Sequence, residues 1–358
     1  MFCIASFIIF AILGLFSASY RPLAKKAWYC VFRKITFRPC DINFDQEVKG
    51  KLLGSIMKRS PLLARFVNKW SNVIAAIFVI LTIWSLLSVL NAGLNLYVYD
   101  TCNPRNVQSC SLGGESCGVD QSSIGFIAAI QNGKLGTWVS DPFILFGKTI
   151  IRIPDRIKTW RAENYLSENT TYLQSFDQSK PTALEVIDPG CHFCAQLLRN
   201  IKEAGFDQKY NLTYIAYPIP STLYEDGHKF KQSYLITRYL EALRIKKGIH
   251  NGIPDDWQLL EKVLLENDTD GTALQVKFNT IYTDKEAEDT ILRLLGSIGY
   301  NENEQAELKT SAHSDAVTEQ IKKNIDIVEK KIRTIKIPTI MFDGRRYDRV
   351  VDVKTLKK

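Results

Sequence analysis

The two cysteines of the run CHFC, Cys191 and Cys194, are the side chains of this 358-residue chain best suited to chemistry. A cysteine thiolate is the nucleophile of thiol–disulfide exchange, and its pKa falls at a helix N-terminus because the helix dipole stabilises the anion there. We expect Cys191 to lie exposed at the start of a helix and to attack. Cys194, one turn deeper, would resolve the mixed disulfide. A protonated His192 beside Cys191 would favour the thiolate.

A strand and a helix must position this motif. The run PTALEVIDP before it is a short apolar strand, and LTYIAYPI beyond it is a second one. Between them, the residues from Cys191 to Gly205 have the pattern of a helix that ends at Gly205. A CxxC can also be half of a zinc site, but zinc needs two further ligands at ordered spacing, and the chain has no second CxxC. The strand–helix setting therefore favours redox chemistry and no metal.

The sequence beyond the second strand is largely helical. Helical spacing of apolar residues predicts helices over residues 229–247 and 255–266, and a further one with the face Val317 to Ile332. Thr283 and Glu286 form a capping box that opens another helix. The run IPTIMFDGRRYDRVV then predicts two strands joined at Asp343-Gly344.

With a CxxC at a strand–helix junction, this region resembles the thioredoxin superfamily, and specifically its DsbA-like branch. Ile337-Pro338-Thr339 looks like the cis-proline loop of that family, and Glu185 stands six residues before Cys191, where the family has an acidic residue that assists proton transfer. The long stretch between Cys194 and Pro338 is similar to the helical insertion of the DsbA-like arrangement. The resemblance implies an α/β, thioredoxin-like domain over residues 166–358 with a helical insert at about 222–334.

The resemblance also implies roles for individual residues. Cys191, Cys194, Glu185 and Pro338 would be catalytic, and His192, Phe193, Ile337 and Thr339 would tune the site, without an organic cofactor. Two alternatives stay open at this point, because Pro338 could be a trans proline at a strand start and Glu185 the outward residue of an alternating strand. The His-Phe dipeptide and the Ile before the proline depart from the DsbA pattern, so the direction of electron flow is open too.

Three more cysteines, Cys102, Cys110 and Cys117, precede the domain in a stretch rich in Gly, Ser and Asn. They could form one disulfide with one cysteine left over. That disulfide would be either a structural staple or a relay that exchanges with the CxxC. The whole of residues 99–165 is expected to be a linker and juxtamembrane segment.

The charge of the chain is concentrated in one segment. The net charge is +8, but residues 20–72 carry +9 and residues 100–358 carry −1, which argues against a nucleic-acid binder. Uncharged apolar runs lie on both sides of the basic segment and predict transmembrane helices at residues 1–20 and 73–98. The first run could instead be a cleaved signal peptide, although no basic residue precedes its apolar core. By the positive-inside rule, residues 21–72 form a cytoplasmic loop, and both termini and the catalytic domain are extracytoplasmic.

The sequence thus predicts a two-pass protein of the cell membrane, anchored in the lipid bilayer, that acts as a thiol–disulfide oxidoreductase on extracytoplasmic protein thiols or disulfides. A membrane redox partner would recycle the CxxC. A reductase or isomerase of the same fold is one alternative. A non-enzymatic module that binds clients in a thioredoxin-like groove is another.

Overall fold

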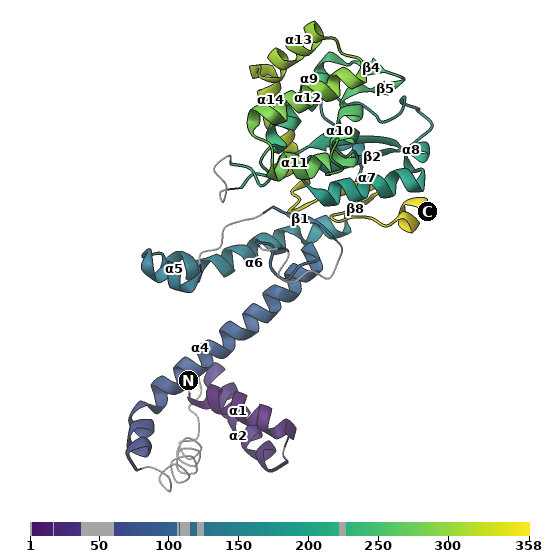
Figure 1. Ribbon diagram of the computed structural model, residues 1–358. Coiled ribbons are helices and arrows are strands. Elements are labelled where there is room, and N and C mark those ends of the chain that lie inside the picture. The colour runs from purple at the N-terminus through teal and green to yellow at the C-terminus, as the bar shows by residue number, and fades with distance from the viewer. Residues whose placement is uncertain are drawn as a thin grey trace. The chain divides into compact units, whose positions relative to one another are not determined.

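The computed structural model describes residues 2–16, 18–36, 61–105, 107, 115–119, 125–221 and 227–358. The chain divides into two compact units, Met1–Asn91 and Ala92–Lys358, which are described separately (Figure 1).

The first unit begins with two helices that pack on each other, α1 (Phe2–Phe16) and α2 (Arg21–Ile35), joined by the short 3-10 helix η1 (Ala18–Tyr20). One face of α2 is apolar at helical spacing. Ala27, Cys30 and Val31 are buried there against α1. The segment predicted as a loop between two spans therefore starts with an amphipathic helix, and its residues 37–60 lie outside the described part of the chain.

The helix α4 (Pro61–Tyr99) contains an apolar stretch, Val73–Tyr99. Within the described residues, this is the one helix long and apolar enough to cross a membrane. The helix α1 has 15 residues. It is about 22 Å long at ~1.5 Å per residue, which is shorter than a hydrocarbon core of about 30 Å. The span expected at residues 1–20 stays a prediction.

The second unit is built on a four-stranded sheet in the order β3-β2-β7-β8. The central strand β2 (Thr182–Ile187) runs parallel to β3 (Asn211–Ala216) and antiparallel to β7 (Thr339–Phe342), which continues into β8 (Arg345–Tyr347). Five of the six β2 residues are buried, as expected for a strand covered on both faces. This is the thioredoxin-like arrangement that the sequence predicted, and the hairpin turns at Asp343-Gly344 as expected.

The connection between the parallel strands carries the CxxC. The helix α7 (His192–Ala204) follows β2 and packs on the core through Cys194, Leu197, Leu198 and Ile201. It ends at Gly205, whose φ of 62° is the left-handed conformation that glycine adopts without steric cost. The single turn α8 (Phe206–Lys209) then leads into β3.

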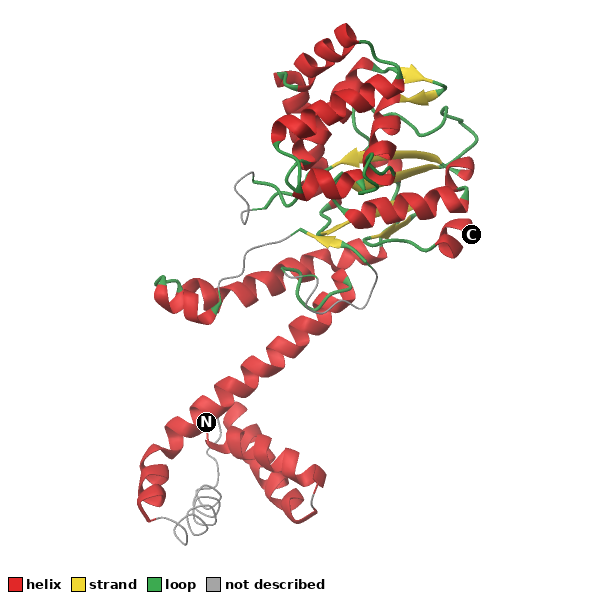
Figure 2. Cartoon of the chain, viewed as in Figure 1, coloured by secondary structure: helices red, strands yellow, loops and turns green. Residues whose placement is uncertain are grey.

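The predicted helical insertion lies between β3 and β7, and Figure 2 shows it as a group of helices beside the sheet. The capping box of Thr283 and Glu286 is present, so that prediction is confirmed. The short hairpin β4–β5 and the helices α11 and α13 were not predicted. The elements of the insertion are α9 (Ser233–Lys246), β4 (Ile249–His250), β5 (Ile253–Pro254), α10 (Asp255–Leu265), α11 (Leu274–Thr280), α12 (Asp284–Ile298), α13 (Glu302–Ala312), α14 (Asp315–Asp326) and the π-helix η3 (Ile327–Ile332).

Buried charges fix this insertion to the sheet. Arg244 of α9 has no solvent exposure, and its Nε donates to Asp256 Oδ2 at 3.0 Å. The same guanidinium donates to the main-chain oxygen of Tyr214 in β3 at 2.7 Å and lies 3.3 Å from Glu241 Oε1. Glu241 also accepts from Asn324 of α14 at 3.0 Å. One cation thus joins β3 to three helices of the insertion.

The segment predicted as a linker, residues 99–165, is largely helical in its described residues. Within it, the strand β1 (Cys117–Gly118) pairs antiparallel with β6 (Lys336–Ile337) just before Pro338. The other elements at the two ends of the unit are α5 (Phe126–Gln131), α6 (Leu135–Ile157), the 3-10 helix η2 (Ala162–Tyr165) and the five-residue helix α15 (Val353–Lys357).

Candidate active site

Cys191 occupies the N-cap position of α7, as the sequence predicted. Its N–H donates to Asp188 O at 2.9 Å, and its carbonyl accepts from Cys194 N at 2.9 Å, so both cysteines belong to the first turn. The thiol of Cys191 was expected to be exposed, but the residue has no solvent exposure. The reason is that the strand β1 covers it.

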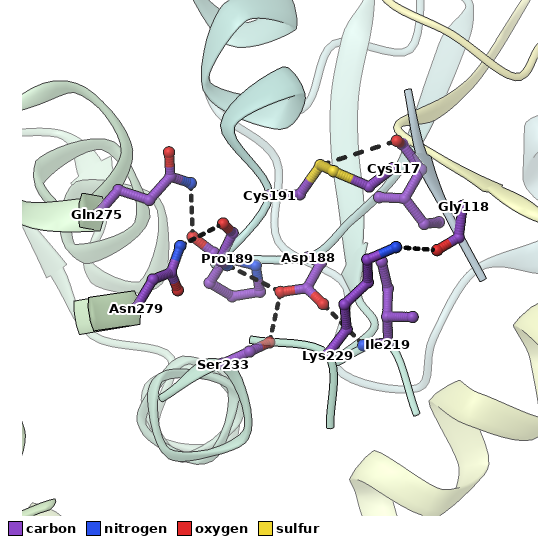
Figure 3. The surroundings of a disulfide bond; sticks show 12 residues. Cys117, Gly118, Asp188, Pro189, Cys191, Ile219, Lys229, Ser233, Gln275 and Asn279 are labelled. Atoms are coloured by element: carbon purple, nitrogen blue, oxygen red, sulfur yellow. Dashed lines mark hydrogen bonds between the residues drawn. A yellow bond between two sulfur atoms is a disulfide. The ribbon is translucent and has the colours of Figure 1, made fainter. Parts of the chain in front are cut away.

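Cys191 is disulfide-bonded to Cys117, with 6.5 Å between their Cα atoms (Figure 3). Cys194 is a free thiol, and it is buried. The sequence left open a disulfide within the linker, either as a staple or as a relay that exchanges with the CxxC, and the structure has Cys117 bonded to the first cysteine of the CxxC. Cys102 is also disulfide-bonded, and Cys110 lies outside the described residues.

Cys194 and Glu185 form a buried acidic pair beneath Cys191. Glu185 is 2% exposed, so the solvent-facing alternative for this residue is wrong. Its Oε1 has no hydrogen-bond partner, and burial raises the pKa of its carboxyl to about 8. Burial also raises the pKa of the Cys194 thiol well above its ordinary value, and the negative charge of Glu185 raises it further. At neutral pH both groups are therefore mostly protonated, and only the ionised fraction of Glu185 can accept a proton from Cys194.

The raised pKa of Glu185 predicts a pH-dependent stability. Between the ordinary pKa near 4.5 and the folded pKa of about 8, the unfolded chain binds fewer protons than the folded one, so stability falls as the pH rises through this window. We expect Glu185→Gln to remove a decline on the order of a few kcal/mol between pH 5 and pH 8. Urea unfolding at several pH values measures it, with the exposed Glu203→Gln as the control. Equal slopes for the wild type and Glu185→Gln would contradict the assignment.

Asp188 holds the turn between β2 and the CxxC, and the sequence analysis missed it. Its carboxylate accepts from Gly190 N at 2.8 Å. It also accepts from Ile219 N at 2.7 Å and from the Ser233 hydroxyl, as Figure 3 shows. Burial raises the pKa of Asp188 to about 6, while these hydrogen bonds lower it. The Asp-Pro pair at the strand end was the available signal, because an Asp that bonds the N–H two residues on is typical of a tight turn.

The helical insertion holds the same turn from the other side. Gln275 and Asn279 of α11 donate to the carbonyl oxygens of Pro189 and Gly190 at 2.8 and 2.7 Å. A Cβ on Gly190 would lie 2.3 Å from the Cβ of Phe230, so only glycine fits. The insertion therefore holds the backbone turn that immediately precedes Cys191. Single-sequence reasoning missed this role because it depends on contacts between residues far apart in the chain.

The loop at Pro338 lies on the other side of Cys191. The Ile337–Pro338 peptide bond is cis, as predicted, and the carbonyl oxygen of Ile337 lies 3.8 Å from Cys191 Sγ. Thr339 begins β7, and its Oγ1 lies 2.8 Å from Lys336 O and from Asp348 Oδ1. Thr339 is thus placed to hold the loop, whereas the carbonyl group of Ile337 lies beside Cys191 Sγ.

The two residues between the cysteines face different surroundings. His192 is exposed, Phe193 is half-buried against the core, and their ring centroids are 3.8 Å apart. His192 therefore stands at the solvent side of the first turn of α7. In the described residues, no group of three or more His, Cys, Asp or Glu side chains is arranged to hold a metal ion.

No family model matches the chain, and no curated protein sequence matches it. Among solved structures, it is similar to a thioredoxin-like oxidoreductase from Silicibacter pomeroyi, with 16% identity over 54% of this chain and 91% of that one and a TM-score of 0.38. The thiol-disulfide exchange protein α-DsbA2 from Wolbachia pipientis has 15% identity over 52% and 83%, with a TM-score of 0.37. ScsC from Proteus mirabilis has 15% identity over 64% and 94%, also with a TM-score of 0.37. Identities of 15–16% and TM-scores of 0.37–0.38 do not assign an activity to this chain, so the function is argued below from the geometry of the site.

Proposed function

We propose that this chain is a membrane-tethered thiol–disulfide oxidoreductase that acts on cysteines of extracytoplasmic proteins. One observation carries the proposal: Cys191, at the start of α7, is already bonded to a cysteine 74 residues away, while Cys194 in the same turn is a free thiol. A mixed disulfide beside a thiol that can resolve it is the intermediate of thiol–disulfide exchange.

The exchange proceeds at the sulfur of Cys191. When Cys191 and Cys194 share a disulfide, a client thiolate attacks Cys191 Sγ and Cys194 leaves as a thiolate. A second client thiolate then attacks the client sulfur of the mixed disulfide and releases Cys191, so the client is oxidised and the CxxC is reduced by two electrons. The reverse sequence reduces a client disulfide. Since the protein needs a protein disulfide or dithiol to return to its starting state, we propose a membrane redox partner.

The buried groups would move the protons of this exchange. Cys194 must lose its proton before it attacks, and Glu185 is the adjacent acceptor with a pKa raised to about 8. The Ile337–Pro338 loop would present backbone groups to a client strand beside Cys191. His192 and Phe193 would tune the stability of the Cys191 thiolate.

A dithiol peptide and its disulfide form test the proposed activity in both directions. We expect Cys191→Ser to lower peptide oxidation and reduction by roughly three orders of magnitude, because the nucleophile is lost. Ser179→Ala removes an exposed hydroxyl in a surface turn, so it is the control for effects of substitution and purification that do not involve the site. The reduction potential of Cys191/Cys194 gives the direction, since about −120 mV indicates an oxidant and about −270 mV a reductant. Equal turnover by wild type and Cys191→Ser would refute the proposal.

A second candidate function follows from the burial of Cys191. A protein that holds clients in a groove without exchanging electrons would keep the Cys117–Cys191 bond as a permanent staple. In that case the wild-type protein and the Cys191→Ser variant would bind unfolded clients equally well, and neither would turn over a peptide substrate. The same pair of proteins therefore separates the two functions.

We propose that the Val73–Tyr99 stretch of α4 anchors the chain and that a second span lies at residues 1–20, with the basic segment after it in the cytoplasm. A membrane-impermeant amine reagent applied to intact cells tests this orientation. Lys322 and Lys330, which are exposed in the second unit, should be modified, whereas Lys25 and Lys26 of α2 should be protected. Modification of Lys25 and Lys26 in intact cells would contradict it.

A further inference from the structure

Residues 115–119 lie alongside β6, the short strand that precedes Pro338, and reach Cys191 through Cys117. Within this segment, Cys117 pairs with Ile337 and Gly118 with Lys336 in antiparallel register. Val119 N donates to Ile335 O at 2.9 Å, which continues the pairing by one residue. At the other end, Val350 N donates to Glu115 O at 3.0 Å.

A third contact ties the segment to the turn before the CxxC. Lys229 Nζ donates to Gly118 O at 2.8 Å, and the N–H of the same lysine donates to Ile219 O at 2.8 Å. Ile219 N in turn donates to Asp188, three residues before Cys191 (Figure 3). The docked segment and the CxxC turn therefore share one hydrogen-bonded support.

These contacts are the ones an extended peptide of almost any sequence would make. The hydrogen bonds are made to the main chain of residues 115, 118 and 119. The disulfide alone depends on a particular side chain, the cysteine that stands opposite Ile337. Strand addition of this kind binds through main-chain hydrogen bonds. Residues 115–119 thus occupy the place and make the covalent bond that an external client needs.

We propose that residues 115–119 are a tethered substrate of the CxxC site and that Cys117 is a third redox-active cysteine, which exchanges with Cys194 for the sulfur of Cys191. This inference rests on the proposed function. In the exchange, the Cys194 thiolate attacks Cys191 Sγ, the Cys191–Cys194 bond forms and the Cys117–Cys191 bond breaks. The proton lost by Cys194 ends on the departing Cys117 thiolate. No electrons are gained or lost overall, so no oxidant or reductant is consumed.

The tether makes Cys117 a strong competitor for external clients. A segment held on the same chain acts at an effective concentration on the order of millimolar. A client peptide at micromolar concentration must therefore displace it. Removing the Cys117 thiol should lower the KM for an external cysteine peptide by roughly tenfold or more, with kcat of the same order. A purely structural disulfide at this position would not produce that split between KM and kcat.

The test maps the disulfides of the full chain in detergent-solubilised membranes across a series of glutathione redox buffers. Acid quenching, alkylation of free thiols and mass spectrometry of unreduced peptides give the fraction of each pair. We expect the wild type to contain both Cys117–Cys191 and Cys191–Cys194, interconverting with time. Cys194→Ala should contain only the first pair, and Cys117→Ala only the second.

Two glycine substitutions distinguish the effect of undocking the strand β1 from the effect of removing the Cys117 thiol. A Cβ on Gly118 would lie 2.2 Å from Val107 Cγ2, so Gly118→Val should undock β1 and lower the ratio of Cys117–Cys191 to Cys191–Cys194 at least tenfold. Gly136 has open space where its Cβ would be, so Gly136→Val is the matched control and should leave the ratio unchanged.

The outcomes distinguish this inference from the proposed function. If Cys117 is never linked to Cys191 while Cys191-dependent peptide oxidation proceeds, the tethered substrate is refuted and the oxidoreductase stands. The same holds if Gly118→Val leaves the ratio unchanged. If Cys117–Cys191 persists in every buffer and no turnover depends on Cys191, both fail.

Discussion

Substitution of Arg244 by methionine is expected to lower the free energy of unfolding by about 3–5 kcal/mol, the largest effect on stability that the structure predicts. The guanidinium has no solvent exposure and holds Asp256 at 3.0 Å and Glu241 at 3.3 Å. Methionine fills much of the same volume but leaves two buried carboxylates without their cation. The cost comes mainly from those charges, and less from lost packing, because the Tyr214 ring, 3.8 Å from the guanidinium, can still contact the new side chain.

The pH dependence identifies the cause of that loss. Burial raises the pKa of Glu241, while the charge of Arg244 lowers it. Without Arg244 the folded pKa rises further, and a carboxyl with a raised folded pKa contributes stability below its unfolded pKa that is lost as the pH rises. The difference between Arg244→Met and wild type should therefore be larger at pH 8 than at pH 5.

Urea unfolding of both proteins at the two pH values measures this difference. Arg293→Met is the matched control, because the side chain of Arg293 is 54% exposed and its ion pair with Asp268 is at the surface. That substitution should change the free energy of unfolding by no more than about 1 kcal/mol. A loss from Arg244→Met below about 1 kcal/mol, or one that does not change with pH, would contradict the account.

Much of the second unit could be predicted from local sequence patterns. The strand before the CxxC, the helix that ends at Gly205, the Thr283–Glu286 capping box and the Asp343-Gly344 hairpin all depend on residues close together in the chain. Hydrophobic periodicity, caps and turn residues act over that short range. The thioredoxin-like arrangement of the sheet was implied by the resemblance to that superfamily, and these local patterns alone did not predict it.

The parts that sequence reasoning missed depend on contacts between distant residues. The strand β1 has only two residues, and its register is set by β6, more than 200 residues later, so no period-2 pattern could reveal it. Gln275 and Asn279 look like ordinary helix residues until the fold brings them to the carbonyls of Pro189 and Gly190. The bond from Cys117 to Cys191 could not be predicted from cysteine spacing, since spacing does not fix connectivity.

Replacement of Cys194 by alanine is expected to lower oxidation of a dithiol peptide by roughly two orders of magnitude or more, because the Cys191–Cys194 disulfide that oxidises the peptide can no longer form. In many exchange enzymes such a variant accumulates adducts with its clients. Here we expect few, because Cys117 already bonds Cys191 and lies docked through β1. The double variant Cys117→Ser/Cys194→Ala frees Cys191, so it should accumulate client adducts that are sensitive to reductant.

Non-reducing gels and mass spectrometry of membranes from cells that produce each variant give the amount of adduct. The double variant Cys117→Ser/Cys191→Ser is the control and should give none, because the attacking sulfur is absent. Equal adduct from Cys194→Ala and Cys117→Ser/Cys194→Ala would show that Cys117 does not hold the site. If the adducts form only when Cys117 is removed, the strand β1 decides when Cys191 meets a client, and the buried pair of Glu185 and Cys194 then determines how fast the client is released.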